Sequence, residues 1–174
     1  MTTLKYTDTT DRAFGLGGMA VAMVVWESER FMQSLDIDAP ADLGLALYPE
    51  FFMIRSPKAS PREAWNDAVE KFQLGTGLLI SNLLCRALVR QNTEITPQMR
   101  QSLVRSLEDE GRQSADLTPA EVEALFSKAY SYFHKIFSHP AVADLTRTLC
   151  STLESERHLG HERVMEILAP LQRL

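Results

Sequence analysis

The sequence predicts an all-α protein, a compact single-domain bundle of about six to seven helices around two central apolar helices. Residues 13–26 and 72–85 carry no charged side chain over fourteen positions each, and both stretches hold glycines near their starts. A helix that is apolar on every face is buried, so we expect these two helices to cross closely at glycine in the centre of the bundle. Strand-like runs are almost absent, and the remaining helical stretches are amphipathic.

Proline-marked capping signals give the helix starts. Residues 60–63 read SPRE and residues 118–121 read TPAE. Each combines an N-cap hydroxyl, a proline at the first helical position and a glutamate at the third, which is a capping box. Thr96 and His139, each followed by proline, give partial versions. We therefore expect helices over residues 11–35, 61–91, 97–111, 119–137, 140–158 and 161–173, and a short helix or turn over residues 40–47.

Other local signals set the limits of the helical region. Asp11 is expected to cap the first helix, and Gly111 and Gly160 fall where helices are expected to stop. Residues 1–10 are rich in threonine and are expected to form a flexible N-terminal segment, with residues 11–174 forming a single helical domain. The length of 174 residues is typical of one domain.

Apolar residues repeat at helical spacing in each later helix, so each is expected to bury one face. In the helix over residues 97–111 that face includes Met99. The only strand-like run, residues 51–54, lies between two prolines and is expected to be an apolar loop on the bundle. The helix over residues 119–137 carries an aromatic stripe formed by Phe126, Tyr130, Phe133 and Phe137.

Composition narrows the function classes. The formal net charge of −5 and the pI of about 5.4 argue against nucleic-acid binding, which needs a basic surface. The uncharged runs are shorter than the roughly 20 residues that span a membrane, and no signal-peptide cleavage pattern follows the first run. We therefore expect a cytoplasmic protein that binds neither nucleic acid nor membranes. Cys85 and Cys150 are expected to be buried thiols, with a single disulfide as the alternative.

Two tryptophans beside charged residues, and a histidine one helical turn after a tyrosine, are the candidate binding residues. Aromatic side chains next to carboxylates can line a ligand pocket, and more commonly they form the rim of a core. Asp67, Glu70 and Lys71 accompany the second tryptophan. The candidate ligand or interaction residues are Trp26, Glu27, Arg30, Trp65, Tyr130 and His134.

No motif indicates a catalytic centre or a cofactor. His158 and His161 lie near glutamates but straddle Gly160, and the Glu-x-x-His pattern of di-iron bundles is missing, so a metal site is disfavoured. The first glycine cluster lacks the preceding strand of a nucleotide-binding loop. Arg86 and Arg90 share a helix face that is expected to be solvated, with an anion or protein contact as the alternative.

Four functional hypotheses remain. An apolar-rich helical chain without catalytic signatures favours a non-catalytic interaction or scaffold protein, which binds another protein or a second copy of itself. The alternative is a regulatory domain that binds a small molecule in a cavity between helices. A metal-dependent enzyme and a nucleic-acid-binding protein are less favoured. A co-purified ligand would favour the regulatory domain, and stoichiometric metal would favour the enzyme.

Overall fold

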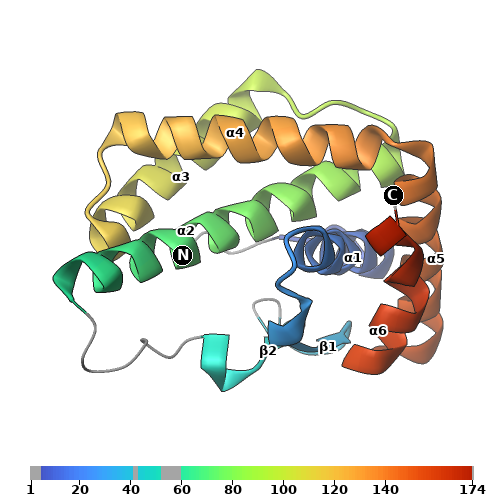
Figure 1. The fold of residues 1–174 in the computed structure, drawn as a ribbon. Coiled ribbons are helices and arrows are strands. Elements are labelled where there is room, and N and C mark those ends of the chain that lie inside the picture. The colour runs from blue at the N-terminus through green and yellow to red at the C-terminus, as the bar shows by residue number, and fades with distance from the viewer. Residues whose placement is uncertain (1–4, 41–42, 52–59, 174) are drawn as a thin grey trace.

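The computed structural model describes residues 5–40, 43–51 and 60–173, and it shows the expected helical bundle (Figure 1). The protein is 77% helical. The main helices are α1 (Thr9–Val25), α2 (Pro61–Leu84), α3 (Pro97–Ala115), α4 (Pro119–Ser138), α5 (Pro140–Glu156) and α6 (His161–Leu168). The shorter elements are the 3-10 helices η1 (Glu29–Phe31), η2 (Pro49–Phe51) and η4 (Ala169–Arg173), the π-helix η3 (Cys85–Gln91), and the strands β1 (Met32–Asp36), β2 (Leu45–Leu47) and β3 (His158–Gly160).

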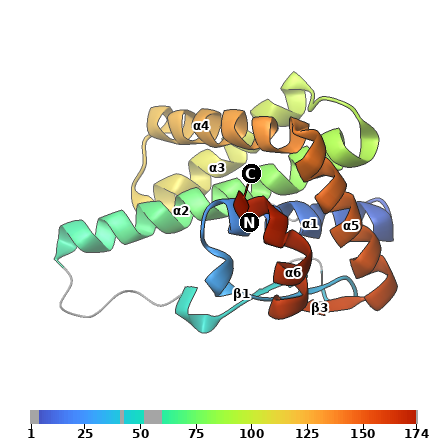
Figure 2. The same cartoon turned by 45° about the vertical axis from the view of Figure 1, so that its right-hand side comes forward.

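Helix α2 is the longest element, and α1, α3 and α4 all pack against it. It continues into η3 without a break, and α3 and α4 run back and forth beside it (Figure 1). Helix α1 packs against α2 and against α5, so α1 lies inside the bundle. Helices α5 and α6 and the small sheet close the end of the molecule around α1 (Figure 2). The two apolar helices are therefore central, as the sequence predicts.

The proline-marked helix starts are confirmed. Ser60 accepts a hydrogen bond from the Glu63 N–H, and the Glu63 carboxylate accepts one from the Ser60 N–H, which completes the capping box of α2. Thr118 and Glu121 make the same reciprocal pair at α4. The cap of α1 differs from expectation, because Asp8 accepts from the Asp11 N–H at 2.7 Å. Asp11 itself is buried inside the bundle.

The expected helix over residues 11–35 ends ten residues early, at Val25. Glu27 takes a left-handed backbone with φ of 53°, and the chain then turns through η1 into β1. Strand β1 is the centre of a three-stranded antiparallel sheet in the order β2-β1-β3. The prediction of a short helix or turn over residues 40–47 is wrong at residues 45–47, which form β2.

Other helix ends also differ from prediction, and the expected helix over residues 161–173 becomes the 3-10 helix η4 after Leu168. Helix α3 continues through Gly111 to Ala115. A Cβ at Gly111 would lie 2.8 Å from Val122 of α4, so this glycine permits close packing of the two helices instead of ending one. Helix α5 ends at Glu156, since Arg157 has φ of 64°, and Gly160 caps α6 instead of ending a helix. Of the expected loop over residues 51–54, only Phe51 lies within the described residues, where it ends η2.

The central helices cross closely at the glycines of α1. A Cβ at Gly18 would lie 2.5 Å from the Ser81 carbonyl oxygen, and one at Gly15 would lie 2.6 Å from the Asn82 amide nitrogen. The glycines of α2 do not take part in this crossing. Gly77 faces the ring of Trp26, which follows the last residue of α1, and nothing lies within 4 Å of a Cβ at Gly75.

One continuous helix, residues 61–91, is long and apolar enough to cross a membrane by length and composition alone. More than half of its most apolar window, 56%, is buried inside the protein. A core helix passes the same length and composition test, so burial against the bundle accounts for this apolar character.

Candidate functional site

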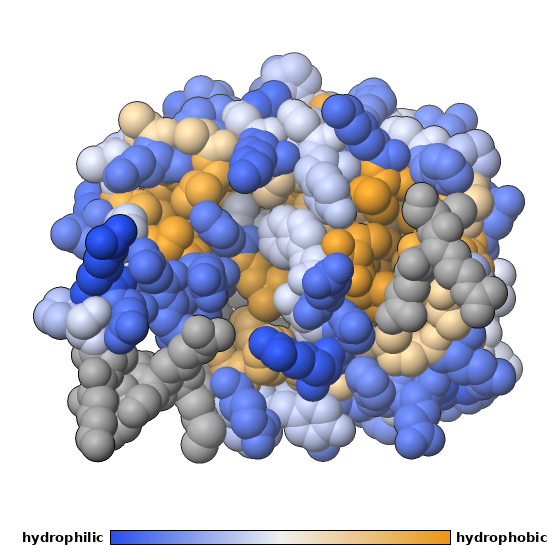
Figure 3. Space-filling view, viewed as in Figure 1, coloured by the Kyte–Doolittle hydropathy of each residue, from blue (hydrophilic) through white to orange (hydrophobic). Residues whose placement is uncertain are grey.

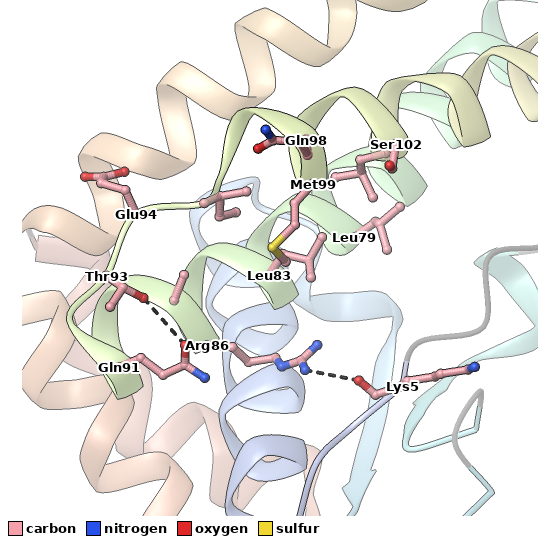
Figure 4. Close-up of a pocket in the computed structure, with 13 residues that line it drawn as sticks. Lys5, Leu79, Leu83, Arg86, Gln91, Thr93, Glu94, Gln98, Met99 and Ser102 are labelled. Atoms are coloured by element: carbon pink, nitrogen blue, oxygen red, sulfur yellow. Dashed lines mark hydrogen bonds between the residues drawn. The ribbon is translucent and has the colours of Figure 1, made fainter.

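A groove opens between α2, η3 and the start of α3, with a cavity volume of about 480 Å³ (Figure 4). Leu79 and Leu83 form one wall, Met99 and Leu103 form the other, and Ile95 lies in the segment that joins them. Figure 4 shows the Met99 side chain reaching from α3 toward Leu83. We call this the α2–α3 groove, and it is lined by Lys5, Leu79, Leu83, Arg86, Ala87, Gln91, Thr93, Glu94, Ile95, Gln98, Met99, Ser102 and Leu103.

The lining of the α2–α3 groove leaves apolar surface open to solvent. Met99 is 50% exposed, whereas the helical spacing of the sequence predicts that it is buried. The other two members of that spacing, Leu103 and Leu107, are buried as expected. In α3, Leu103 and Leu107 therefore reach the core, whereas Met99, in the first turn of the helix, lies over the groove. The periodicity of the sequence could not separate these two roles.

Tyr130 and His134 lie one turn apart on α4, and His134 contacts one end of the groove through Glu94. The His134 Nε2 lies 3.1 Å from both carboxylate oxygens of Glu94, a residue that lines the groove. The Tyr130 ring lies 6.0 Å from the His134 ring, and the Arg100 guanidinium lies 5.1 Å above the Tyr130 ring. These contacts fix the segment between η3 and α3 against α4.

An ion-pair cluster around the buried Asp11 lies beside the groove and includes Arg86, one of the lining residues. Arg86 donates to Asp11 at 2.8 and 2.5 Å, and Arg90 donates to it at 2.7 Å. Asp8 adds a second carboxylate at 2.7 Å from Arg90. The expectation that Arg86 and Arg90 form a solvated face is therefore wrong, since both side chains are mostly buried against an acidic partner.

The electrostatics of this cluster favour the charged form of Asp11. Burial acts to raise the pKa of the Asp11 carboxyl. The hydrogen bonds from Arg86 and from the Thr7 N–H, together with the charges of Arg86 and Arg90, outweigh burial and lower this pKa below its usual range. Both arginines come from η3, and π-helical turns are frequent at functional sites.

A second pocket, of about 380 Å³, lies between α2 and the η1–η2 region and brings together several residues singled out in the sequence. Trp26 and Arg30 line it, as do Asp67, Glu70 and Lys71 of α2. Sequence reasoning missed its other aromatic residues, since no helical or strand pattern connects them. We call it the tryptophan pocket, and its remaining lining residues are Ser28, Phe31, Glu50, Phe51, Gln73 and Leu74.

The two remaining candidate residues, Trp65 and Glu27, line neither the tryptophan pocket nor the α2–α3 groove. Trp65 is 47% exposed, and its indole N–H donates to the Ala115 carbonyl oxygen at 3.0 Å, which joins α2 to the end of α3. Glu27 occupies the left-handed turn after α1 and is exposed.

Figure 3 shows that hydrophobic residues on the face seen in Figure 1 gather in separate areas bounded by hydrophilic residues.

The histidines near the C-terminus have a structural role. His161 contacts the Met32 carbonyl oxygen through Nδ1 at 3.0 Å and so joins α6 to β1, and His158 pairs with Asp36 in the sheet. Among the described residues, no group of three or more His, Cys, Asp or Glu side chains is placed to hold a metal ion. Cys85 and Cys150 are free and buried, as the sequence predicts.

Comparison of the chain with protein-family models, with curated proteins and with solved structures finds no match.

Proposed function

We propose that this protein is a non-catalytic interaction protein that binds an amphipathic helix of a different protein in the α2–α3 groove. The observation that supports the proposal is the half-exposed Met99 beside partly buried Leu79 and Leu83 in an open groove between two helices. Exposed apolar surface of this kind marks interfaces, and grooves between helices are a recurring site for amphipathic helices.

The spacing of the lining residues fits a helical occupant. Leu79, Leu83 and Ala87 follow one another at four-residue intervals, as Met99 and Leu103 do on the opposite wall. Eight residues of helix span about 12 Å, so the groove offers contact to roughly two turns of a partner helix. The partner would insert apolar side chains at the i, i+3 or i+4, and i+7 positions and keep its polar face in water.

The shape of the groove favours a foreign helix over a second copy of the chain. A two-fold dimer joins the same patch on both subunits, and a concave patch does not fill a copy of itself. A second copy also offers no apolar helix stripe among the described residues. The most exposed large apolar side chains there lie on five separate segments of the chain, at Leu43, Tyr48, Trp65, Met99 and Tyr132.

Selection of a displayed library of amphipathic peptides, of roughly 8–14 residues, tests the proposal. We expect binders that gain helicity on binding and that lose about tenfold or more in affinity for Met99→Glu, because a buried methionine contributes about 1.5–3 kcal/mol. Leu43→Glu is the matched control, since Leu43 is 59% exposed and lies outside the groove. Binders that are indifferent to Met99→Glu would contradict the proposal.

The binding of a small molecule is the second candidate function, and a different site favours it. The tryptophan pocket combines aromatic and charged side chains in a cavity whose volume, about 380 Å³, falls within the range of small-molecule sites.

A further inference from the structure

The tryptophan pocket presents aromatic surface on one side. Phe31 and Phe51 lie edge to face with ring centroids 5.8 Å apart, and Trp26 contributes a third ring. Trp26 is itself held by the core, since its ring lies 4.8 Å from that of Phe133 and directly over Gly77. The aromatic wall is therefore pre-formed, which lowers the entropic cost of binding.

Charged side chains of both signs also line the tryptophan pocket. Asp67 and Lys71 neutralise each other in an ion pair at 3.0 Å. Arg30, Glu50 and Glu70 also line the pocket, and none of these three forms an ion pair with another described residue. The Arg30 guanidinium lies 4.7 Å over the Phe31 ring, which holds a cation at the edge of the aromatic wall.

We propose that the tryptophan pocket binds a zwitterionic ligand of amino-acid size with an apolar side chain. Arg30 binds the carboxylate, for which the planar guanidinium is the best-suited side chain. Glu70, with Glu50 as the second carboxylate, binds the ammonium group. The apolar side chain of the ligand lies on Trp26 and Phe31. A zwitterion satisfies the cation and the carboxylates together, whereas a simple anion or a simple cation satisfies one sign only.

The fluorescence of Trp26 reports directly on this site. The chain has two tryptophans, and Trp65→Phe leaves Trp26 as the only one. We expect L-phenylalanine to change the Trp26 emission saturably in this variant, with phenylalaninamide and N-acetylphenylalanine, each of which lacks one charge, binding about tenfold more weakly.

Two substitutions test which pocket residue binds each charged group of the ligand. Arg30→Gln should weaken the binding of phenylalanine about tenfold and leave phenylalaninamide unchanged, since the amide has no carboxylate to lose. Glu70→Gln should weaken the binding of phenylalanine and leave the binding of N-acetylphenylalanine unchanged, since the acetylated compound has no ammonium group to lose. Arg62→Gln, on the same helix as Glu70 but outside the pocket, is the matched control and should change nothing.

Three results would overturn the proposal. One is the absence of any saturable change in the emission of the Trp65→Phe protein, with its helical circular dichroism intact. The second is equal binding of phenylalanine and phenylalaninamide, which would make the pocket a cation site. The third is an equal loss of phenylalanine binding in Arg30→Gln and in Arg62→Gln. Where Arg30→Gln lowers the melting temperature, Arg30→Lys keeps the charge, and it should retain more phenylalanine binding than Arg30→Gln.

Discussion

Asp11, whose side chain is 1% exposed, accepts hydrogen bonds from the Arg86 Nε at 2.8 Å and the Arg86 Nη2 at 2.5 Å. The pair joins the first turn of α1 to the π-helical end of α2, beside the α2–α3 groove. Asn82, one turn before Arg86, is fully buried and donates to the Tyr6 hydroxyl at 3.0 Å. Residues 6–11 are thus tied to the central helix by charge and by hydrogen bonds, and α1 adds apolar contact.

Removal of Asp11 should destabilise the protein strongly. Asp11→Ala leaves the mostly buried Arg86 without a carboxylate partner and leaves Arg90 with Asp8 alone, and loss of one member of a buried ion pair costs about 3–5 kcal/mol. The free energy of unfolding from urea denaturation measures the loss. Asp144→Ala is the control, because its ion pair with Arg147 is exposed and should contribute far less. Equal effects of the two substitutions would contradict a structural role for the cluster.

The same cluster should make stability depend on pH in the acid range. The pKa of Asp11 is lowered in the folded protein, so its contribution to stability is complete above the ordinary value of 3.8 and is lost as the pH falls below that value toward the folded pKa. The unfolding free energy should therefore fall more steeply below about pH 4 in the wild type than in Asp11→Asn. Identical slopes in the two proteins would show that Asp11 does not titrate with folding.

Alanine should have opposite effects at two helical glycines. Gly18→Ala places a methyl group 2.5 Å from the Ser81 carbonyl oxygen and should cost about 1–3 kcal/mol. Gly75→Ala meets nothing within 4 Å and should stabilise the protein by up to about 1 kcal/mol, since alanine favours helix. Thermal and urea unfolding of the two variants give the signs. A gain in stability for Gly18→Ala would contradict the close crossing of α1 and α2.

The two thiols should be inert while the protein is folded. Burial raises the pKa of Cys85 and of Cys150, and neither forms a disulfide. The thiolate is the reactive form, so a chromogenic disulfide reagent at neutral pH should label neither cysteine in the native protein and both in denaturant. Rapid labelling of the native protein would place at least one thiol at the surface.

Local signals predicted the helices because helix starts are decided by neighbouring residues. The sequences SPRE and TPAE at residues 60–63 and 118–121 place both partners of a capping box within one turn, and both boxes form. The sheet could not be predicted in the same way. Strand β3 pairs with β1 across more than a hundred residues, and three residues give no periodicity to detect. The left-handed backbone that follows α1 occurs at Glu27, which is not a glycine, so the sequence did not predict where α1 ends.

The candidate sites were predicted in part, for the same reason. Trp26 and Arg30 are near neighbours in the sequence and do line one pocket, but the Phe51 wall comes from a distant segment. The partner of Arg86 lies 75 residues away, so a helix face with two arginines looked solvated when it is buried. Met99 shows the converse, since helical spacing alone assigns it to a core that it does not reach.

The most direct measurement of the central claim is a methyl NMR titration of the protein, labelled at its seven methionines, with a selected helical peptide. Met99→Leu assigns the Met99 signal, and Met23, which has no exposed surface, serves as the internal control. The account predicts that the Met99 methyl shifts saturably while the Met23 methyl does not, with the protein at the 19.6 kDa of one chain by light scattering before addition of the peptide. A Met99 signal that stays in place while the peptide binds would contradict the account, as would a dimer that Met99→Glu dissociates.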